Sequence, residues 1–327
     1  MNNKGFTGII SFLRSNVTTD DIIKVMRDLM LFNPTSFRSN LKDFKRLGKN
    51  NFWEQVRLNL EQTSYFRSYA KDFKQDPIRL DEISISFFPT TNIVHIRFVI
   101  NTENDEVLNL LEKNISCFVE SHVILSASLR SIGEYNWNDN SDLELQKRNH
   151  KEIEVIQTIQ IAYVDYADVR QFSGHTQDYE GVWFGCSYEM WFGEDYNKYI
   201  SLDIIKHFDD CEQNVEYKNG TVFIKMFRTY NDYDKLSSME RAFMFRRVTK
   251  CDEAFSYWKN EIDEQSVLQE QYSNEIEKGL FPHGGIRRMK IYLDKNNNQT
   301  VKAKAAKVHV SELGNDGKLI YEEIIDL

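Results

Sequence analysis

Glycine, proline and cysteine are scarce in this sequence, and each shortage argues against a class of protein. The 327 residues include 14 glycines, and neither GxGxxG nor a Walker loop occurs, which argues against loops that cradle phosphate groups. With only four prolines, long flexible linkers are not expected. The four cysteines lie far apart without a CxxC pair. They are too sparse for a disulfide scaffold and favour a reducing, cytoplasmic location.

Long apolar runs are also missing. No stretch approaches the roughly 18 to 20 residues that span a bilayer, so we predict no membrane partner. Residues 1–21 contain a short apolar patch without a small-residue cleavage site, which predicts a strand rather than a signal peptide. There is no HExxH motif and no cysteine pair at ligand spacing, so neither a metal nor a cofactor is predicted.

The net charge of −9 is unevenly distributed. Residues 1–80 carry 14 Lys and Arg against 8 Asp and Glu, a net charge of +6, which leaves −15 for the remainder. An acidic body argues against a nucleic-acid partner, because phosphates need a basic surface. It suits a basic protein partner, which the negative field would steer into contact. Solubility alone is the competing explanation for this charge.

Hydrophobic periodicity predicts an α+β protein of mostly antiparallel sheets with helices packed on one face. In the first half we expect a strand near 5–13, a helix capped by Thr19, a helix over 51–73, a hairpin over 81–101, a helix capped by Asn104 and a strand over 123–132. The polar segment 134–152 has no apolar period. It predicts a domain boundary near residue 145.

The second half repeats this pattern loosely. We expect a strand over 153–164, a short helix over 201–208, a hairpin turning at Asn219-Gly220, a helix from Ser237 and a charged helical stretch over 252–278. The last segment, 286–327, predicts a three-stranded β-meander. The predicted organisation is therefore an N-terminal domain, 1–145, a C-terminal domain, 146–280, and a β-rich extension, 281–327.

An aromatic run, GVWFGCSYEMWF, stands out in the second half. Read as one strand, residues 182–192 alternate between an apolar face, which predicts core, and a face with Trp183 and Trp191 on either side of Glu189. A covering helix would explain that second face. If exposed, it is suited to binding, since tryptophans anchor protein interfaces. The predicted partner-binding residues are Asp178, Tyr179, Glu180, Trp183, Glu189, Trp191, Glu194, Asp195 and Tyr196.

Two other groupings would favour an enzyme. A nucleophilic cysteine with a nearby base would use His175, Asp178, Glu180 and Cys186. A metal-dependent nuclease, whose carboxylates hold magnesium and whose lysine steadies the attacking water, would use Asp209, Asp210, Glu216 and Lys218. Plainer explanations compete in both cases. A cysteine in an apolar strand is usually a core residue, and Lys218 abuts the Asn219-Gly220 turn.

Two further features involve histidines. The residues from His283 to Gly285, followed by Arg287 and Arg288, form either a small anion-binding nest or an ordinary turn before a strand. His95 lies in a strand otherwise rich in Ile and Val, which indicates a core or cross-strand histidine. None of the seven histidines has a carboxylate partner at an evident fixed spacing.

The succession YEGVWFGCSYEMWFGEDYNKYISLDIIKHF, then VEYKNGTVFIKMF, then a capped helix, resembles bacterial polymorphic-toxin immunity proteins over about residues 180–250. In that family a Trp/Phe-Gly strand leads to a Tyr-Ile-Ser helix start, followed by an NG hairpin. The resemblance implies a non-enzymatic cytoplasmic inhibitor that occupies a cognate toxin. The alternatives are a nuclease or other hydrolase, and a phage-related or structural assembly protein. The latter would form a homo-oligomer through the helix over 252–278.

Overall fold

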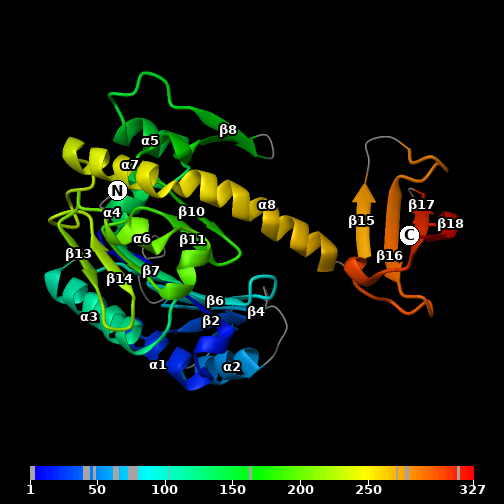
Figure 1. Cartoon of the computed structure of the whole chain (residues 1–327), viewed down its shortest axis with the longest axis horizontal. Coiled ribbons are helices and arrows are strands. Elements are labelled where there is room, and N and C mark those ends of the chain that lie inside the picture. The colour runs from blue at the N-terminus through cyan, green and yellow to red at the C-terminus, as the bar shows by residue number, and fades with distance from the viewer. Residues whose placement is uncertain are drawn as a thin grey trace. The chain divides into compact units, whose positions relative to one another are not determined.

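The computed structural model describes residues 4–39, 45–46, 49–61, 66–72, 80–102, 104–161, 164–269, 272–276, 280–314 and 317–327. They form two compact units, Met1–Trp258 and Lys259–Leu327 (Figure 1). The predicted α+β class is confirmed, since helices surround a large antiparallel sheet in the first unit. No described helix combines the length and apolar character needed to span a membrane.

A ten-stranded sheet dominates the first unit, and every neighbouring pair of its strands is antiparallel. In order across the sheet, the strands are β13 (Gln213–Glu216), β14 (Val222–Lys225), β12 (Glu189–Phe192), β7 (Ser126–Ser131), β1 (Phe6–Leu13), β6 (Ile93–Ile100), β5 (Glu82–Phe88), β4 (Phe66–Lys71), β2 (Ser36–Ser39) and β3 (Lys45–Arg46). The predicted hairpins, one over 81–101 and one turning at Asn219-Gly220, are its pairs β5–β6 and β13–β14.

The middle of the sheet follows the split β-α-β plan of ferredoxin-like folds. Along the chain, β1, α1 (Thr19–Leu29), β5, β6, α3 (Asp105–Ser121) and β7 alternate so that the strands lie in the order β7-β1-β6-β5. Each helix has a clear start signal. The Asn104 side chain accepts the Val107 N–H at 2.7 Å, as predicted. A capping box at Thr18 begins α1, one residue before the predicted Thr19.

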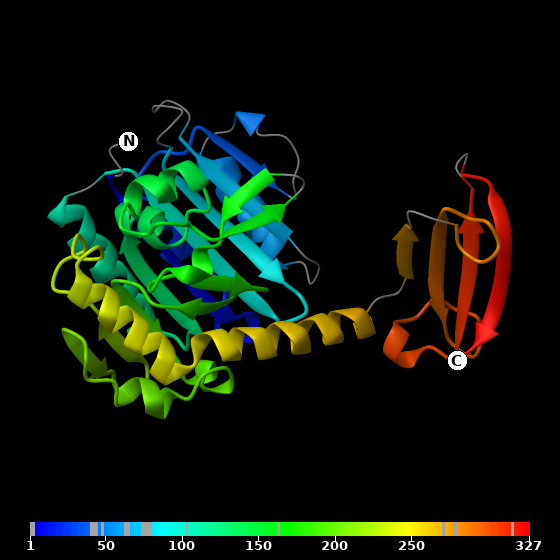
Figure 2. The ribbon, with the colours of Figure 1, turned by 90° about the horizontal axis from the view of Figure 1, so that it is seen from above.

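Helices cover both faces of this sheet. Figure 1 shows α1, α2 (Lys49–Glu61) and α3 on one side, with α4 (Ile132–Asn138) and α7 (Leu236–Thr249) on the other. Figure 2, which looks down on the second side, shows that the small sheet of β10 (Thr176–Tyr179) and β11 (Val182–Gly185) also lies over it. The large sheet is therefore an interior layer, and side chains on both of its faces meet other parts of the protein.

The expected division at residue 145 differs from the structure, because the boundary falls inside the first unit. Strand β7, before the boundary, pairs with β12, after it, in the register Leu129↔Glu189. The polar segment around the boundary is also ordered, as α4 and α5 (Leu143–Asn149). Their N-caps are Ser131 and Asp142. The two expected halves therefore share one sheet.

Three other predicted elements are different in the structure. The helix expected over 51–73 ends at Glu61, and its remainder contains the strand β4, whose residues alternate between buried and half-buried. The helix expected over 252–278 ends earlier, as α8 (Cys251–Gln269), and is followed by the strand β15 (Tyr272–Ile276). The strand expected over 153–164 is part of a hairpin of β8 (Thr158–Ile161) and β9 (Val164–Ala167). The short helix α6 (Leu202–Lys206) lies where it was predicted.

The second unit contains a four-stranded antiparallel sheet in the order β15-β16-β17-β18. The predicted three-stranded meander corresponds to β16 (Arg287–Leu293), β17 (Lys307–Leu313) and β18 (Leu319–Asp326). A small core of Tyr292, Val308 and Val310 supports it. The turn that follows β16 contains Asn297 with a φ of 65°, and Asn315 and Asp316, between β17 and β18, lie outside the described residues.

Candidate functional site

The aromatic run over 182–192 is two strands in two different sheets, not one strand. β11 pairs with β10 in the small sheet, whereas β12 lies between β7 and β14 in the large one. Gly185 ends β11 with a φ of 157°, a backbone conformation that side chains rarely allow. The chain moves from one sheet to the other at this point, so residues 182–192 do not alternate between two faces of one strand. The two predicted faces are therefore absent from these described residues.

The aromatic members of the predicted partner-binding surface are buried. The exposed fraction is 3% for Trp183, 0% for Trp191 and 0% for Tyr196, and Glu189 is only 1% exposed. Trp191 packs against Phe223 with ring centroids 5.1 Å apart. The Tyr196 hydroxyl donates to the Trp183 carbonyl at 2.8 Å. These four residues were predicted to contact a partner, and that prediction is wrong for this conformation because layers on both faces of the sheet enclose them.

Glu189 meets its counter-charge inside the protein. Its Oε1 lies 2.8 Å from Lys225 Nζ, which is also 3.5 Å from Glu112 Oε1. Burial raises the pKa of Glu189, and the neighbouring Glu112 adds to the rise while Lys225 opposes it. Burial alone would lower the pKa of Lys225, but the two carboxylates raise it. The group is therefore an internal ion cluster that ties β12 and β14 to α3.

The charged members of the predicted surface do reach solvent. The side chain of Asp178 is 41% exposed, and Glu194, at the start of the short helix η3 (Glu194–Lys198), is exposed. Asp195 is half-buried and accepts a hydrogen bond from Asn16 Nδ2 at 2.7 Å. Tyr179 and Glu180, at the β10–β11 turn, are also half-buried. The predicted site thus separates into buried aromatic rings and accessible carboxylates.

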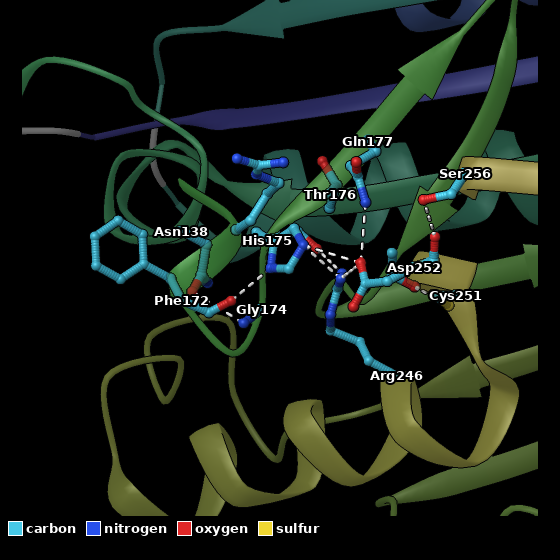
Figure 3. A network of polar contacts seen from close by, with 12 residues as sticks. Asn138, Phe172, Gly174, His175, Thr176, Gln177, Arg246, Cys251, Asp252 and Ser256 are labelled. Atoms are coloured by element: carbon cyan, nitrogen blue, oxygen red, sulfur yellow. Dashed lines mark hydrogen bonds and ion pairs between the residues drawn. The ribbon is translucent and has the colours of Figure 1, made fainter. Parts of the chain in front are cut away.

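His175 and Cys186, the proposed base and nucleophile, have other contacts. Figure 3 shows His175 in a cluster with Arg246 and Asp252, and Gln177 beside them. The His175 Nδ1 lies 2.7 Å from the Phe172 carbonyl, and its Nε2 lies 3.2 Å from Asp252 Oδ1 and in contact with Arg246. Both ring nitrogens therefore have partners, and those of Nε2 connect the start of β10 to α7 and α8.

Electrostatics in this cluster favours a structural role. Burial alone would raise the pKa of Asp252, but its hydrogen bond to His175 and the Arg246 guanidinium lower it to about 2. Cys186 is buried, and burial raises the pKa of its thiol well above the usual value, with Glu134 adding to the rise. A nucleophilic cysteine requires a lowered pKa. The Cys186 thiol has the opposite property.

Two residues of the predicted nuclease site, Glu216 and Lys218, lie at the β13–β14 hairpin. Glu216 Oε1 is 2.7 Å from Lys206 Nζ, and Asp210 Oδ1 is 3.1 Å from Arg241 Nε. The structure thus gives each of these carboxylates a cationic partner. Within the described part of the chain, no three His, Cys, Asp or Glu side chains gather in a way that could hold a metal ion.

The predicted anion-binding nest at His283 to Gly285 is occupied by a carboxylate side chain of the protein itself. The carboxylate of Glu312, a buried residue of β17, accepts the backbone N–H groups of His283 at 3.0 Å and Gly285 at 3.2 Å. Arg288 Nη2 donates to the same carboxylate at 2.9 Å. Burial alone would raise the pKa of Glu312, but Arg288, His283 and the backbone donors lower it to about 2. An internal carboxylate therefore fills this nest.

A polar cavity of about 230 Å³ lies between the large sheet and the layer that covers its second face. We call it the sheet-face pocket. The sheet lines it with side chains from β1, β6 and β7, namely Thr7, Ile9, His95, Arg97, Ser128 and Arg130. The covering layer lines it with Tyr135, Asp139, Thr176, Asp178 and Trp183. Asp178 and Trp183 are directly paired across β10 and β11, so the structure brings together two of the predicted site residues here.

Most of the pocket's residues were not predicted as a site. The signal for them was a period of two, with His95 and Arg97 in the otherwise apolar β6, and Ser128 and Arg130 in the serine-rich β7. Polar residues that break the pattern of an interior sheet are expected at functional positions. Assigning them to one pocket required the strand order, which places β1 between β6 and β7.

Comparison of the sequence with protein-family models and with curated proteins finds no match. The functional argument therefore depends on the chemistry of two places in the first unit. One is the sheet-face pocket. The other is the exposed acidic segment 194–216, which ends in β13 and which we call the acidic edge. Its exposed carboxylates are Glu194, Asp203, Asp209, Asp210, Glu212 and Glu216.

Proposed function

We propose that this protein is a non-catalytic cytoplasmic binding protein of the immunity type, which neutralises a basic toxin through its acidic edge. The observation that carries the proposal is the concentration of charge there. Residues 194–216 contain seven Asp and Glu against two Lys, a net charge of −5. A field of this kind steers a basic partner into contact and favours it over neutral or acidic proteins.

The charges of the acidic edge are only partly neutralised within the protein. Arg241 pairs with Asp210 and Glu212, and Lys206 pairs with Glu216. Among the described residues, the Asp203 carboxylate has only a contact of 3.5 Å with the exposed His207. Glu194 and Asp209 form no ion pair with any residue that the structure describes. Several carboxylates therefore remain available to the lysines and arginines of a partner.

The position of β13 supports the same proposal. It is the outermost strand at its end of the ten-stranded sheet, and Gln213, Val215 and Glu216 are exposed. An outer strand offers backbone donors and acceptors with which a strand of another protein can pair. The partner we expect is therefore a basic protein that combines backbone pairing along β13 with contacts to the acidic edge. Unlike the sequence-based prediction, this one does not depend on tryptophan anchors.

The proposal is tested with the product of the neighbouring gene. If that gene encodes a protein with a basic toxin domain, we expect co-expression of this protein to restore growth. We expect the double charge reversal Asp203→Lys/Asp209→Lys to weaken binding at least about tenfold, mainly through slower association. The binding constant is measured by calorimetry, and the association rate at low and high salt.

The matched control reverses two exposed carboxylates on the opposite side of the sheet. Glu61→Lys/Glu120→Lys makes the same change in net charge near the C-terminal ends of α2 and α3, where lysine is compatible with the helix dipole. A local acidic edge predicts that this control binds almost as tightly as the wild type. If the two variants lose binding affinity equally, the effect comes from net charge alone and the acidic edge is not the binding surface.

A further inference from the structure

The sheet-face pocket contains a guanidinium that has no ion-pair partner among the described residues. Of its two carboxylates, Asp139 pairs with Arg130, and Asp178 Oδ2 lies 3.5 Å from His95 Nδ1. Arg97 is exposed and forms no ion pair with the described residues. Its contact is with the ring of Tyr135, whose centroid is 5.8 Å from the Arg97 guanidinium carbon. The pocket therefore has one guanidinium free to bind an anion.

Two further hydrogen-bond donors of the pocket come from Ser128 and Trp183. Both residues line the cavity and are only 3% exposed. The Ser128 hydroxyl and the Trp183 indole N–H have no hydrogen-bond partner among the described residues, and neither is one of the enclosed polar atoms that lack a partner. Both donors are therefore open to the cavity, where a ligand can accept hydrogen bonds from them beside the Arg97 guanidinium.

The remaining polar groups show which kind of occupant fits. The Thr7 hydroxyl donates to the Phe98 carbonyl at 2.9 Å. Thr176 is bound to Asp139 through its N–H at 2.6 Å and its hydroxyl at 2.9 Å. What the pocket still offers is thus a set of donors and a cation, provided by Arg97, Ser128 and Trp183. The matching chemistry is an oxyanion, which accepts several hydrogen bonds and neutralises an arginine.

We propose that the sheet-face pocket binds a small molecule through a carboxylate or phosphate group. In this site Arg97 pairs with the oxyanion, and Ser128 and Trp183 donate hydrogen bonds to it. The cavity volume of about 230 Å³ corresponds to about eight water molecules at roughly 30 Å³ each, which suits a metabolite-sized ligand rather than a peptide. This site is separate from the acidic edge, so it is a second function beyond the one proposed above.

The test uses inorganic phosphate and acetate as separate probes of the full-length protein. The ¹⁵N-labelled indole N–H of Trp183, identified with the variant Trp183→Phe, reports on the pocket by NMR. We expect one of the two ions to shift this signal in a saturable way. Arg97→Gln should weaken that binding about tenfold or more, because it removes the charge that pairs with the anion.

The control is Arg57→Gln, which removes an exposed arginine of α2 on the opposite side of the sheet. It should bind the ion as the wild type does. Preference for phosphate would identify a phosphorylated ligand, and preference for acetate a carboxylate. The proposal is overturned if neither ion shifts the Trp183 signal in the folded protein, or if Arg97→Gln binds as tightly as Arg57→Gln.

Discussion

Single side chains inside the first unit differ in how well their charge is compensated. Arg246, Asp252 and His175 satisfy one another, and Lys225 pairs with Oε1 of Glu189, whose Oε2 has no partner within the described structure. Glu134 of α4 has no ion-pair partner among the described residues. It is 1% exposed, its Oε1 accepts the Tyr188 N–H at 3.1 Å, and its Oε2 has no partner within the described structure. Burial raises the pKa of Glu134 to about 8, although Arg130 opposes the rise.

This raised pKa predicts how stability changes with pH. In the unfolded chain Glu134 loses its proton near its ordinary pKa of 4.5, whereas in the folded protein it keeps the proton until about pH 8. The folded state therefore binds more protons between these values, and the free energy of unfolding falls as pH rises from about 4.5 to about 8. Glu134→Gln should remove this contribution. At pH 8 it should stabilise the protein by about 1.4 kcal/mol or more, the equivalent of one pKa unit.

Urea unfolding of the wild type and Glu134→Gln at a series of pH values measures the difference. The two free energies should converge near pH 4 and separate toward pH 8. Parallel profiles across this range would contradict a proton held by Glu134 in the folded state.

The sequence identifies candidate residues for the site, but it does not predict which of them are buried or what packs against them. The carboxylates at Asp178 and Glu194 were expected at the surface and are there. Trp183 and Trp191 were expected on one face of one strand, and they belong to different sheets. Burial of an aromatic residue depends on what packs over it, and the segments that pack here come from distant parts of the chain. The sequence pattern of residues 182–192 contains no information about which distant segments pack over them.

At the scale of helices and strands, sequence-based predictions are correct where residues close together in the sequence determine the structure. The hairpin over 81–101 and the start of α3 at Asn104 follow from alternation, turn residues and capping. Strand β4 lies where the sequence predicts helix, because its short alternating segment comes soon after α2 in the sequence. Its strand character depends on pairing with β5 and β2. Pairing of that kind is a tertiary effect that overrides local propensity.

The start of α1 provides a matched test of one such local signal. The Thr18 hydroxyl accepts the Asp21 N–H at 3.2 Å, and Asp21 Oδ2 accepts the Thr18 N–H at 3.0 Å. Thr18→Ala should therefore lower the free energy of unfolding by about 1 kcal/mol, the usual loss for a removed cap. Thr19→Ala should change it by less than about 0.5 kcal/mol, because within the described structure the Thr19 hydroxyl has only a long contact of 3.4 Å with Arg14. Chemical denaturation of both variants decides between the two positions, and a larger effect at Thr19 would contradict the structure.

At the scale of the whole molecule, the large sheet unites two parts of the chain that looked separate. The polar composition of residues 134–152 resembles a linker, yet β7 and β12 meet across it. We therefore expect the fragment 1–145 to self-associate, because it leaves an edge of β7 and the apolar side chains behind it open. The fragment 1–269 keeps all the strands of that sheet and should retain the oligomeric state of the full chain.

Light scattering with size-exclusion chromatography compares the two fragments. If fragment 1–145 stays monomeric and unfolds cooperatively, residues 1–145 form an independent domain and the expectation of self-association is wrong.

The pairing of β7 with β12 also has a consequence for synthesis on the ribosome. The six elements of the ferredoxin-like middle are complete once Ser131 has emerged, but β12 begins only 58 residues later, at Glu189. At translation rates of roughly 5 to 20 residues per second, the nascent chain holds an open strand edge for about 3 to 12 seconds. Slow translation between these residues would lengthen that interval, so the yield of native protein should be most sensitive to codon choice in this stretch.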